Sequence, residues 1–323
     1  MEQIKMVAVA SHSPENVVSN DELSKLMDTN DEWIYTRTGI HQRHVVTTEN
    51  TSDLATIVAK KLLDKTGISP ETLDFIIVST MSPDSLSPST AAIVQSNVGA
   101  TNAFAFDLSA ACSGFVYGMS VASSLLTTRY RRGLVIGAEV LSKLVDWHDR
   151  TTAVLFGDGA AGVLVERTQE NVGLLAEELR TFGEKDDNLV AGRFANDNPF
   201  SKQISELDPY FHQNGREVYN FATREVPEAL QSALEQAKIS PDDVDYYLLH
   251  QANSRIVASI AKRFKQPMSK FPINMVLNGN TSAASIGILL NDLVESGQVH
   301  AGQTIALAGF GGGLTVGAQV WQL

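Results

Sequence analysis

Two spacings of hydrophobic residues alternate along the chain and predict alternating helices and strands. Residues 54–67 and 226–238 have the pattern of amphipathic helices, with apolar side chains on one face. Each is followed by a Ser-Pro turn and then by an apolar, aromatic run, which predicts strands at 75–78 and 246–249. This recurring helix–turn–strand order predicts an α/β protein.

The two segments are copies of one unit. "ISPETLDFIIV", from Ile68, and "ISPDDVDYYLL", from Ile239, lie 171 residues apart and share four of eleven residues. Small residues, an apolar helix, a strand, a glycine turn and a final strand occupy 110–166 and recur in that order over 279–323. We therefore predict two pseudo-symmetric α/β halves, 1–172 and 173–323. The helices that follow Ser113 and Ala284 are apolar nearly all round, which predicts that both are buried at the centre.

One segment interrupts this pattern. Residues 183–216 are polar and rich in turn-forming residues. They predict a long surface excursion, either a functional flap or a tolerated insertion.

Composition and charge narrow the class of protein. The chain has 323 residues, a formal net charge of −12 and one cysteine. The charge argues against nucleic-acid binding, and a single cysteine excludes a disulfide framework and fits a reducing compartment. We find neither a signal peptide nor an apolar run long enough to span a membrane, so we expect a cytoplasmic protein. His41 and His44, without further ligands, are weak evidence for a metal.

The repeat brings three chemically distinct side chains towards one seam. Cys112 precedes one central helix, Asn280 precedes its copy, and His250 ends a predicted strand. A helix N-terminus favours a thiolate, so Cys112 is a candidate nucleophile, although a lone cysteine is also often a buried hydrophobe. His250 can act as a base or a neutral donor, whereas the amide of Asn280 only holds or donates.

Two neutral donors around one oxygen stabilise an enolate or an oxyanion. Cysteine, histidine and asparagine together thus indicate acyl transfer to sulfur followed by carbanion chemistry. They also occur in papain-like hydrolases, but the "CGSCW" type of signature is absent.

Six segments resemble the 3-ketoacyl-acyl carrier protein synthase III family, the initiating condensing enzymes of bacterial fatty acid synthesis. They are "MDTNDEWIYTRTGIHQRH", "DLSAACSGFVYGMS", "DRTTAVLFGDGAAG", "LLHQANSRI", "GNTSAASI" and "GFGGGLT". The resemblance implies a thiolase-like fold with αβαβα layers. It also implies that an acyl-CoA primer loads onto Cys112 and condenses with malonyl-acyl carrier protein to give 3-ketoacyl-acyl carrier protein, coenzyme A and carbon dioxide. Thiolases add a second cysteine, and elongating ketosynthases use two histidines, so the Cys–His–Asn set favours this family.

The resemblance also assigns roles to other residues and partners. It implies an oxyanion hole at Gly312, decarboxylation support from Phe310, and an acyl pocket near Leu86 and Ser87. It implies no cofactor, a homodimer and a carrier-protein partner, which binds through a local basic patch on this acidic chain. The implied coenzyme A contacts are Trp33, Arg37 and Arg150, and the implied carrier-protein contacts are Gln251, Arg255, Lys262 and Arg263.

Some features depart from the family or imitate another one. "GDGAAG", residues 157–162, matches a dinucleotide fingerprint, but the following "VLVE" predicts a strand where that motif needs a helix. Val316, Gly287 and Asn278 replace the family's usual Trp, Pro and aromatic or His. Ser87 replaces a bulkier residue, which suggests room for a primer longer than acetyl. Two alternatives stay open: a starter-unit acyltransferase of another pathway, and a catalytically silent acyl-binding protein.

Overall fold

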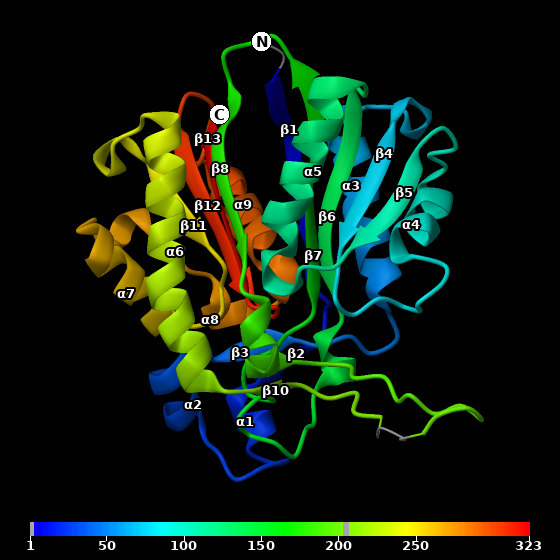
Figure 1. Ribbon diagram of the computed structural model, residues 1–323, viewed down its shortest axis with the longest axis vertical. Coiled ribbons are helices and arrows are strands. Elements are labelled where there is room, and N and C mark those ends of the chain that lie inside the picture. Colours follow the sequence, from blue (N-terminus) through cyan, green and yellow to red (C-terminus); the bar gives the residue numbers. More distant parts are fainter. Residues whose placement is uncertain (1–2, 203–206) are drawn as a thin grey trace.

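The computed structural model describes residues 3–202 and 207–323 and arranges them in five layers (Figure 1). Two β-sheets enclose a central pair of helices, and further helices cover the outer face of each sheet. This is the predicted thiolase-like α/β fold.

The first sheet has the strand order β1-β7-β6-β4-β5, and the second has the order β11-β12-β13-β8. In the first sheet β4 pairs in parallel with β5 and β6, whereas β7 pairs antiparallel with β1 and β6. In the second sheet β11 and β12 are parallel, and β13 is antiparallel to both of its neighbours. The strands of the two sheets are β1 (Gln3–His12), β4 (Phe75–Ser79), β5 (Phe104–Leu108), β6 (Arg132–Glu139), β7 (Gly159–Thr168), β8 (Gly173–Thr181), β11 (Tyr246–Leu249), β12 (Thr304–Gly311) and β13 (Thr315–Gln322).

Every strand of the first sheet precedes residue 172, and every strand of the second follows it. The division into halves 1–172 and 173–323 stays our interpretation of the repeat. β7 begins at Gly159, so a strand and not a helix follows "GDGAAG", as predicted.

Helices α5 (Gly114–Thr128) and α9 (Ser285–Glu295) form the central layer. Their apolar side chains, such as Phe115 and Leu289, share one buried cluster with residues of both sheets, such as Val135 of β6 and Leu307 of β12. The outer helices are α3 (Thr51–Thr66) and α4 (Thr90–Val98) on the first sheet, and α6 (Gly215–Ala237) and α7 (Ser254–Phe264) on the second. Burial on both faces explains why the central helices lack a polar side.

Helix α6 begins well before the predicted residue 226, and Pro227 lies inside it. The helix continues through this proline because its apolar face packs against the second sheet, where Val226, Ala229 and Leu230 are buried. Tertiary packing thus overrides the local helix-breaking tendency of proline.

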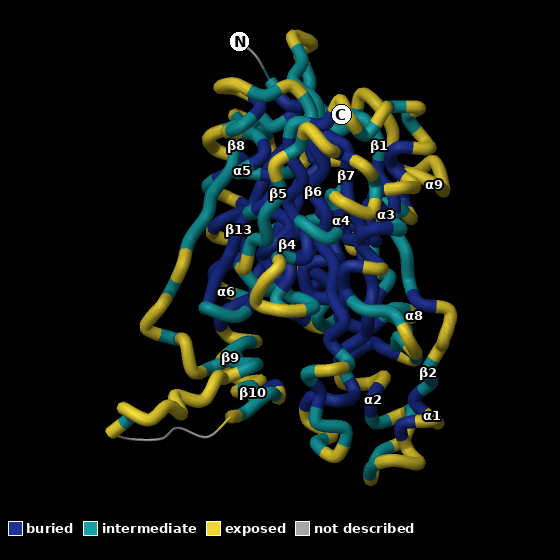
Figure 2. Tube along the Cα trace, turned by 90° about the vertical axis from the view of Figure 1, so that its right-hand side faces the viewer, coloured by how far each residue is buried: buried dark blue, intermediate teal, exposed yellow. Residues whose placement is uncertain are grey.

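Among its described residues, the predicted excursion 183–216 contains a 3₁₀ segment (Gly183–Asn188), the short strands β9 (Leu189–Val190) and β10 (His212–Gln213), which pair antiparallel, and the start of α6 at Gly215. Figures 1 and 2 show the described residues between the two strands, 191–202 and 207–210, as parts of an arm that projects from the body and is largely exposed. Residues 203–206 of this predicted excursion lie outside the described residues.

A smaller group of elements lies at one end of the sheets, opposite the two termini (Figure 1). It consists of β2 (Val17–Ser19), α1 (Asn20–Leu23), α2 (Asp31–Thr38), β3 (Gln42–His44) and α8 (Met275–Asn278). Asn30 caps α2 by accepting from the Trp33 N–H, and Gly39 ends it in a left-handed conformation. A Cβ at Gly39 would lie 2.6 Å from Ser254 Oγ, so glycine permits α2 to approach the start of α7.

Candidate active site

One cleft of about 1400 Å³ lies beside the carboxyl ends of β4, β5 and β11. It is lined by residues from both halves of the repeat. Nine of the predicted site residues line it, namely Trp33, Arg37, Leu86, Cys112, Arg150, His250, Asn280, Phe310 and Gly312.

Cys112 lies in a 3₁₀ turn, Ala111–Ser113, between β5 and α5. Ala111 has φ of 44°, a left-handed conformation that costs a non-glycine residue about 1 kcal/mol or more. Strand β12 presses against this turn: a Cβ at Gly311 would lie 2.8 Å from Cys112 Cβ and 3.1 Å from its Sγ. Only glycine therefore fits behind the thiol.

Cys112 is 6% exposed, and burial raises the pKa of its thiol to about 12. The Ser282 hydroxyl and the backbone N–H of Cys112 oppose this rise in pKa, while the Glu139 carboxylate adds to it. The sequence predicted a thiolate favoured by the helix N-terminus, but burial outweighs that effect here. The resting side chain is a neutral thiol at pH 7.

Glu139 ends β6 and is completely buried, and the sequence analysis missed it. Its carboxylate accepts hydrogen bonds from Ser82 Oγ at 2.5 Å, Thr80 Oγ1 at 3.1 Å and the Met81 N–H at 3.2 Å. Burial raises the pKa of Glu139 to about 7 despite these bonds. Its position as a single carboxylate directly after the apolar run of β6 was the available signal.

His250 follows β11 and is 2% exposed. Its Nδ1 lies 2.7 Å from Ser285 Oγ, and its ring meets the Phe310 ring edge to face, with centroids 5.1 Å apart. Burial lowers the pKa of His250 to about 3, so the imidazole is neutral at pH 7. This charge state suits a donor of a neutral hydrogen bond better than a general base.

Hydrogen bonds hold both the side chain and the backbone of Asn280. The Ser282 N–H donates to Asn280 Oδ1 at 2.9 Å, which defines the orientation of the amide and leaves Nδ2 as the donor. Its backbone bonds to Leu155 and Gly157, at 2.9 and 3.0 Å, across the seam between the halves.

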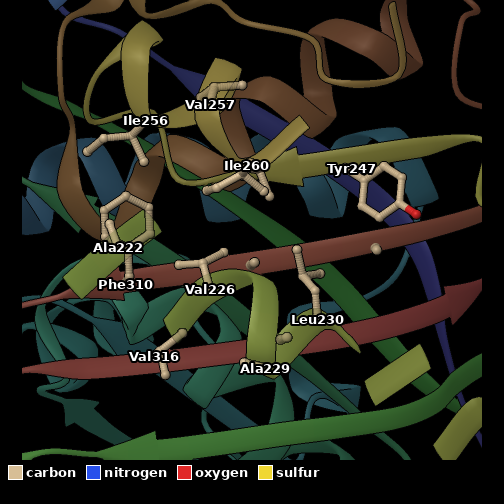
Figure 3. Close-up of a cluster of buried hydrophobic side chains, with 14 of the residues drawn as sticks. Ala222, Val226, Ala229, Leu230, Tyr247, Ile256, Val257, Ile260, Phe310 and Val316 are labelled. Atoms are coloured by element: carbon tan, nitrogen blue, oxygen red, sulfur yellow. The ribbon is translucent and has the colours of Figure 1, made fainter. Parts of the chain in front are cut away.

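Phe310 has one edge at the site and its remaining surface in the core. Figure 3 shows it near Ala222 and Ile256, in the apolar cluster between α6, α7 and the second sheet. Gly312 follows in the turn after β12, and a Cβ there would lie 3.3 Å from the carbonyl oxygen of Leu189.

Trp33 lines the cleft, and two guanidinium groups lie close to its indole ring. Arg37 Cζ is 4.3 Å and Arg150 Cζ is 5.1 Å from the centroid of the indole ring. Arg150 also donates to the carbonyl of Asp28 at 2.9 Å. A planar base that enters between Trp33 and Arg150 must replace this cation–π contact.

The predicted carrier-protein residues separate into two groups. Arg255, Lys262 and Arg263 are exposed on α7. Arg255 donates to the Thr36 carbonyl at 2.6 Å, and Arg263 Nη2 lies 3.5 Å from Glu228 Oε1.

Gln251 corrects one prediction. It is 1% exposed, donates to the Leu249 carbonyl at 2.8 Å and accepts from the Asn274 N–H at 3.0 Å. A side chain so enclosed cannot contact a docking protein, so Gln251 has a structural role. Gln251 was predicted because it follows His250 in the sequence. In the structure it is buried against Asn274, which precedes α8, and Ser285, which begins α9.

The predicted acyl-pocket residues also differ from one another. Leu86 lines the cleft yet is 78% exposed, whereas Ser87 is not among the lining residues. Among the departures from the family, Gly287 lies where a Cβ would be 2.8 Å from Ala161 Cβ, which explains glycine there. His41 and His44 make separate contacts, with the Asp31 carboxylate and the Pro14 carbonyl.

Paired sheets around two central helices, with this cleft at their common edge, define the class of thiolase-like α/β enzymes. Models of the families 3-Oxoacyl-[acyl-carrier-protein (ACP)] synthase III and its C-terminal region match residues 106–183 and 234–323. The chain is 55% identical to the beta-ketoacyl-[acyl-carrier-protein] synthase III of Lactococcus lactis subsp. lactis over 99% of both chains. It is 52% identical to that of Limosilactobacillus reuteri over 98% of both chains.

Solved structures agree with this assignment. The 3-oxoacyl-[acyl-carrier-protein] synthase III of Aquifex aeolicus superposes with a TM-score of 0.93 at 40% identity, over 99% of this chain and 100% of that one. The chain belongs to the 3-oxoacyl-[acyl-carrier-protein] synthase III family. In the part of the chain that the structure describes, no helix has the length and hydrophobicity needed to cross a bilayer.

Proposed function

We propose that this chain is the initiating condensing enzyme of fatty acid synthesis, with Cys112 as the nucleophile and His250 and Asn280 as the two hydrogen-bond donors. The family assignment supports the reaction, an acyl transfer between coenzyme A and carrier-protein thioesters. The observation that carries the residue roles is that all three side chains line one cleft, the last two with fixed orientations.

In the first half-reaction, Cys112 sulfur attacks the thioester carbonyl of an acyl-CoA. A carbon–sulfur bond forms to Cys112, the bond to coenzyme A sulfur breaks, and the thiol proton leaves with coenzyme A. The backbone N–H groups of Cys112 and Gly312 hold the oxyanion of this step. Because the free thiol has a raised pKa, binding of the thioester must accompany its deprotonation.

In the second half-reaction, malonyl-acyl carrier protein loses carbon dioxide and leaves an enolate on its thioester. His250 Nε2 and Asn280 Nδ2 donate to the enolate oxygen, and both are neutral, so they stabilise its charge without neutralising it by proton transfer. Phe310 provides an apolar wall that disfavours the departing carboxylate. The carbanion attacks the acyl carbonyl, a carbon–carbon bond forms and the carbon–sulfur bond to Cys112 breaks. The released Cys112 thiolate takes one proton from solvent and returns to the neutral thiol. Atoms and electrons balance without a cofactor, so we propose that none is required.

The surface features suggest where substrates and a second subunit bind. Trp33, Arg37 and Arg150 suit the adenine and phosphates of coenzyme A by stacking and ion pairing. Arg255, Lys262 and Arg263 offer positive charge to an acidic carrier protein. The carbonyl of Arg37 accepts from Asn253 Nδ2 at 2.9 Å, so these two surfaces share one rim of the cleft.

We propose a homodimer in which β5 of each subunit lies at the interface. β5 is an edge strand of its sheet, and Phe104 on it is 38% exposed. Unpaired edge strands with exposed aromatic side chains favour association. Leu86 and Ser87 then lie where a second subunit could cover them.

Intact-mass spectrometry tests the proposed chemistry. The protein and its Cys112→Ala variant are each incubated with acetyl-, butyryl- and hexanoyl-CoA, and malonyl-acyl carrier protein is then added. We expect one acyl adduct on the unmodified chain, none on the variant, and discharge of the adduct as 3-ketoacyl-acyl carrier protein. No adduct with any acyl-CoA would overturn the proposal.

A second candidate is a starter-unit enzyme of another pathway. The priming beta-ketosynthase from the R1128 polyketide biosynthetic pathway superposes with a TM-score of 0.91 at 30% identity, over 99% of this chain. An adduct that forms only with longer primers, and that the carrier protein of fatty acid synthesis does not discharge, would favour this candidate.

A further inference from the structure

The first residue of α9, Ser285, contacts the back of the His250 imidazole. Its Oγ lies 2.7 Å from His250 Nδ1 and accepts from the Gln251 N–H at 3.4 Å. Ser285 is 2% exposed, so bulk water does not compete for these bonds. The contact joins the central helix directly to the end of β11.

The hydrogen bonds that the Ser285 hydroxyl can make favour one tautomer of His250. A serine hydroxyl has a single proton to donate, and its oxygen accepts the others. Its two partners among the described residues are the Gln251 N–H, which only donates, and His250 Nδ1. If Nδ1 carried a proton, the oxygen would accept both bonds and the buried serine proton would have no acceptor among these partners, at a cost of about 1–3 kcal/mol. The favoured arrangement therefore directs the serine proton at an unprotonated Nδ1. A neutral imidazole with a bare Nδ1 carries its proton on Nε2.

The first half of the repeat has a related contact between a strand end and a central helix, but there the serine lies on the strand and not on the helix. Ser79 and Gly114 are the counterparts of His250 and Ser285 at an offset of 171 residues. In the first half Ser79 Oγ donates to the Gly114 carbonyl at 2.7 Å. A Cβ at Gly114 would lie 3.1 Å from Ser79 Cβ, so that position holds no side chain. Of the two central helices, α9 has a serine hydroxyl at this position, and α9 is the helix that contacts the strand end with the histidine.

We propose that Ser285 is a positioning residue that holds His250 in the tautomer with its proton on Nε2, directed at the substrate carbonyl. This inference rests on the proposed role of His250 as a donor. The opposite tautomer would present a lone pair to the enolate and would repel its charge. Burial lowers the pKa of His250 and keeps the imidazole neutral, so a single ring proton occupies one nitrogen or the other.

Nitrogen-15 NMR of histidine-labelled protein tests the tautomer without any substrate. The chain has seven histidines, and the signals of His250 are those that disappear in His250→Gln. We expect an unprotonated Nδ1 and a protonated Nε2 from pH 5 to 8, and a mixture of tautomers in Ser285→Ala. A proton on Nδ1 in the unmodified protein would overturn the proposal.

Kinetics test the consequence, with Ser79→Ala as the matched control because it also removes one buried serine hydroxyl. Ser285→Ala should lower kcat for decarboxylation of malonyl-acyl carrier protein roughly tenfold or more, with little change in KM, since an oxyanion donor is disordered but not removed. The rate at which acyl-CoA loads Cys112 should stay unchanged.

The outcomes separate this inference from the proposed function. If His250→Ala decarboxylates as fast as the unmodified protein, the proposed role of His250 is wrong. If His250→Ala is slow while Ser285→Ala and Ser79→Ala behave alike, the role of His250 stands and that of Ser285 is wrong.

Discussion

Ala111 and Ser282 share a left-handed backbone, with φ of 44° and 46°, although neither is glycine and 171 residues separate them. Each lies in the turn before a central helix, and each turn packs against a strand of the other half. A Cβ at Gly137 of β6 would lie 2.2 Å from the Ala283 carbonyl oxygen, and one at Gly309 of β12 would lie 2.9 Å from Ser113 Cα. This reciprocal packing holds Cys112 and Asn280 at one seam.

The strain at Ala111 gives the first prediction. Ala111→Gly should leave the free energy of unfolding within about 1 kcal/mol, because relief of the left-handed conformation offsets the added backbone entropy. Ala122→Gly, at an ordinary buried position in α5, should lower it by about 1 kcal/mol or more. Urea unfolding followed by circular dichroism measures both. Equal losses in the two variants would show that Ala111 is not strained.

Gly311 gives a prediction about the nucleophile. In Gly311→Ala the new methyl group would meet Cys112 Cβ at 2.8 Å, so the thiol must move. We expect acyl loading from acyl-CoA to slow by about a hundredfold, since a shift of about 1 Å at a reacting atom has that effect. Gly183→Ala, where a Cβ meets no atom within 4 Å, is the control and should load normally. Normal loading in Gly311→Ala would contradict this account of the turn.

Glu139 gives a prediction about pH. Its negative charge raises the pKa of the Cys112 thiol, and its own pKa is about 7. Glu139→Gln should therefore speed alkylation of Cys112 by iodoacetamide, and the gain should grow as pH rises through 7. Glu177→Gln is the control, because that carboxylate accepts from Ser120 and Gln319. Identical pH profiles in Glu139→Gln and the unmodified protein would refute the effect.

The same residue predicts a change in stability. The folded pKa of Glu139 is raised above its ordinary value of 4.5, so the protonated form favours the folded state. Its contribution is full below pH 4.5 and is lost as pH rises to 7, at up to about 1.4 kcal/mol per pH unit. Relative to the unmodified protein, Glu139→Gln should become more stable over that interval. Urea unfolding from pH 5 to 8 checks the sign.

The sequence could predict that Cys112, His250 and Asn280 lie together, because the repeat places strand ends and helix starts at one seam. The carboxylate at the end of β6 was a weak signal for Glu139, and no signal pointed to Ser285, since the environment of both comes from burial between elements distant in the chain. The pKa of the thiol was misjudged for the same reason: a helix N-terminus is visible in a sequence, whereas enclosure by β12 is not. Gln251 shows the converse error, in which a neighbour of a functional residue proved to be buried.

Trp33 gives a prediction about the primer. Trp33→Ala should raise KM for acyl-CoA about tenfold, because stacking of an aromatic ring on a base contributes roughly 1–3 kcal/mol. The same variant should use an acyl-pantetheine as well as the unmodified protein does, because that substrate lacks adenine. Steady-state assays with both thioesters distinguish loss of stacking from damage to the cleft. An equal rise in KM for both would indicate damage.

Lys262 gives a prediction about the carrier protein. It is exposed on α7, and Lys262→Glu should lower kcat/KM for malonyl-acyl carrier protein roughly fivefold, mainly through slower association. The difference should shrink as ionic strength rises, because exposed charges are screened. Lys60→Glu makes the same charge change on α3, which covers the other sheet, and should have little effect. With malonyl-pantetheine the Lys262→Glu and unmodified proteins should react alike. If Lys60→Glu slows the reaction as much as Lys262→Glu does, net charge and not a docking surface on α7 governs carrier-protein binding.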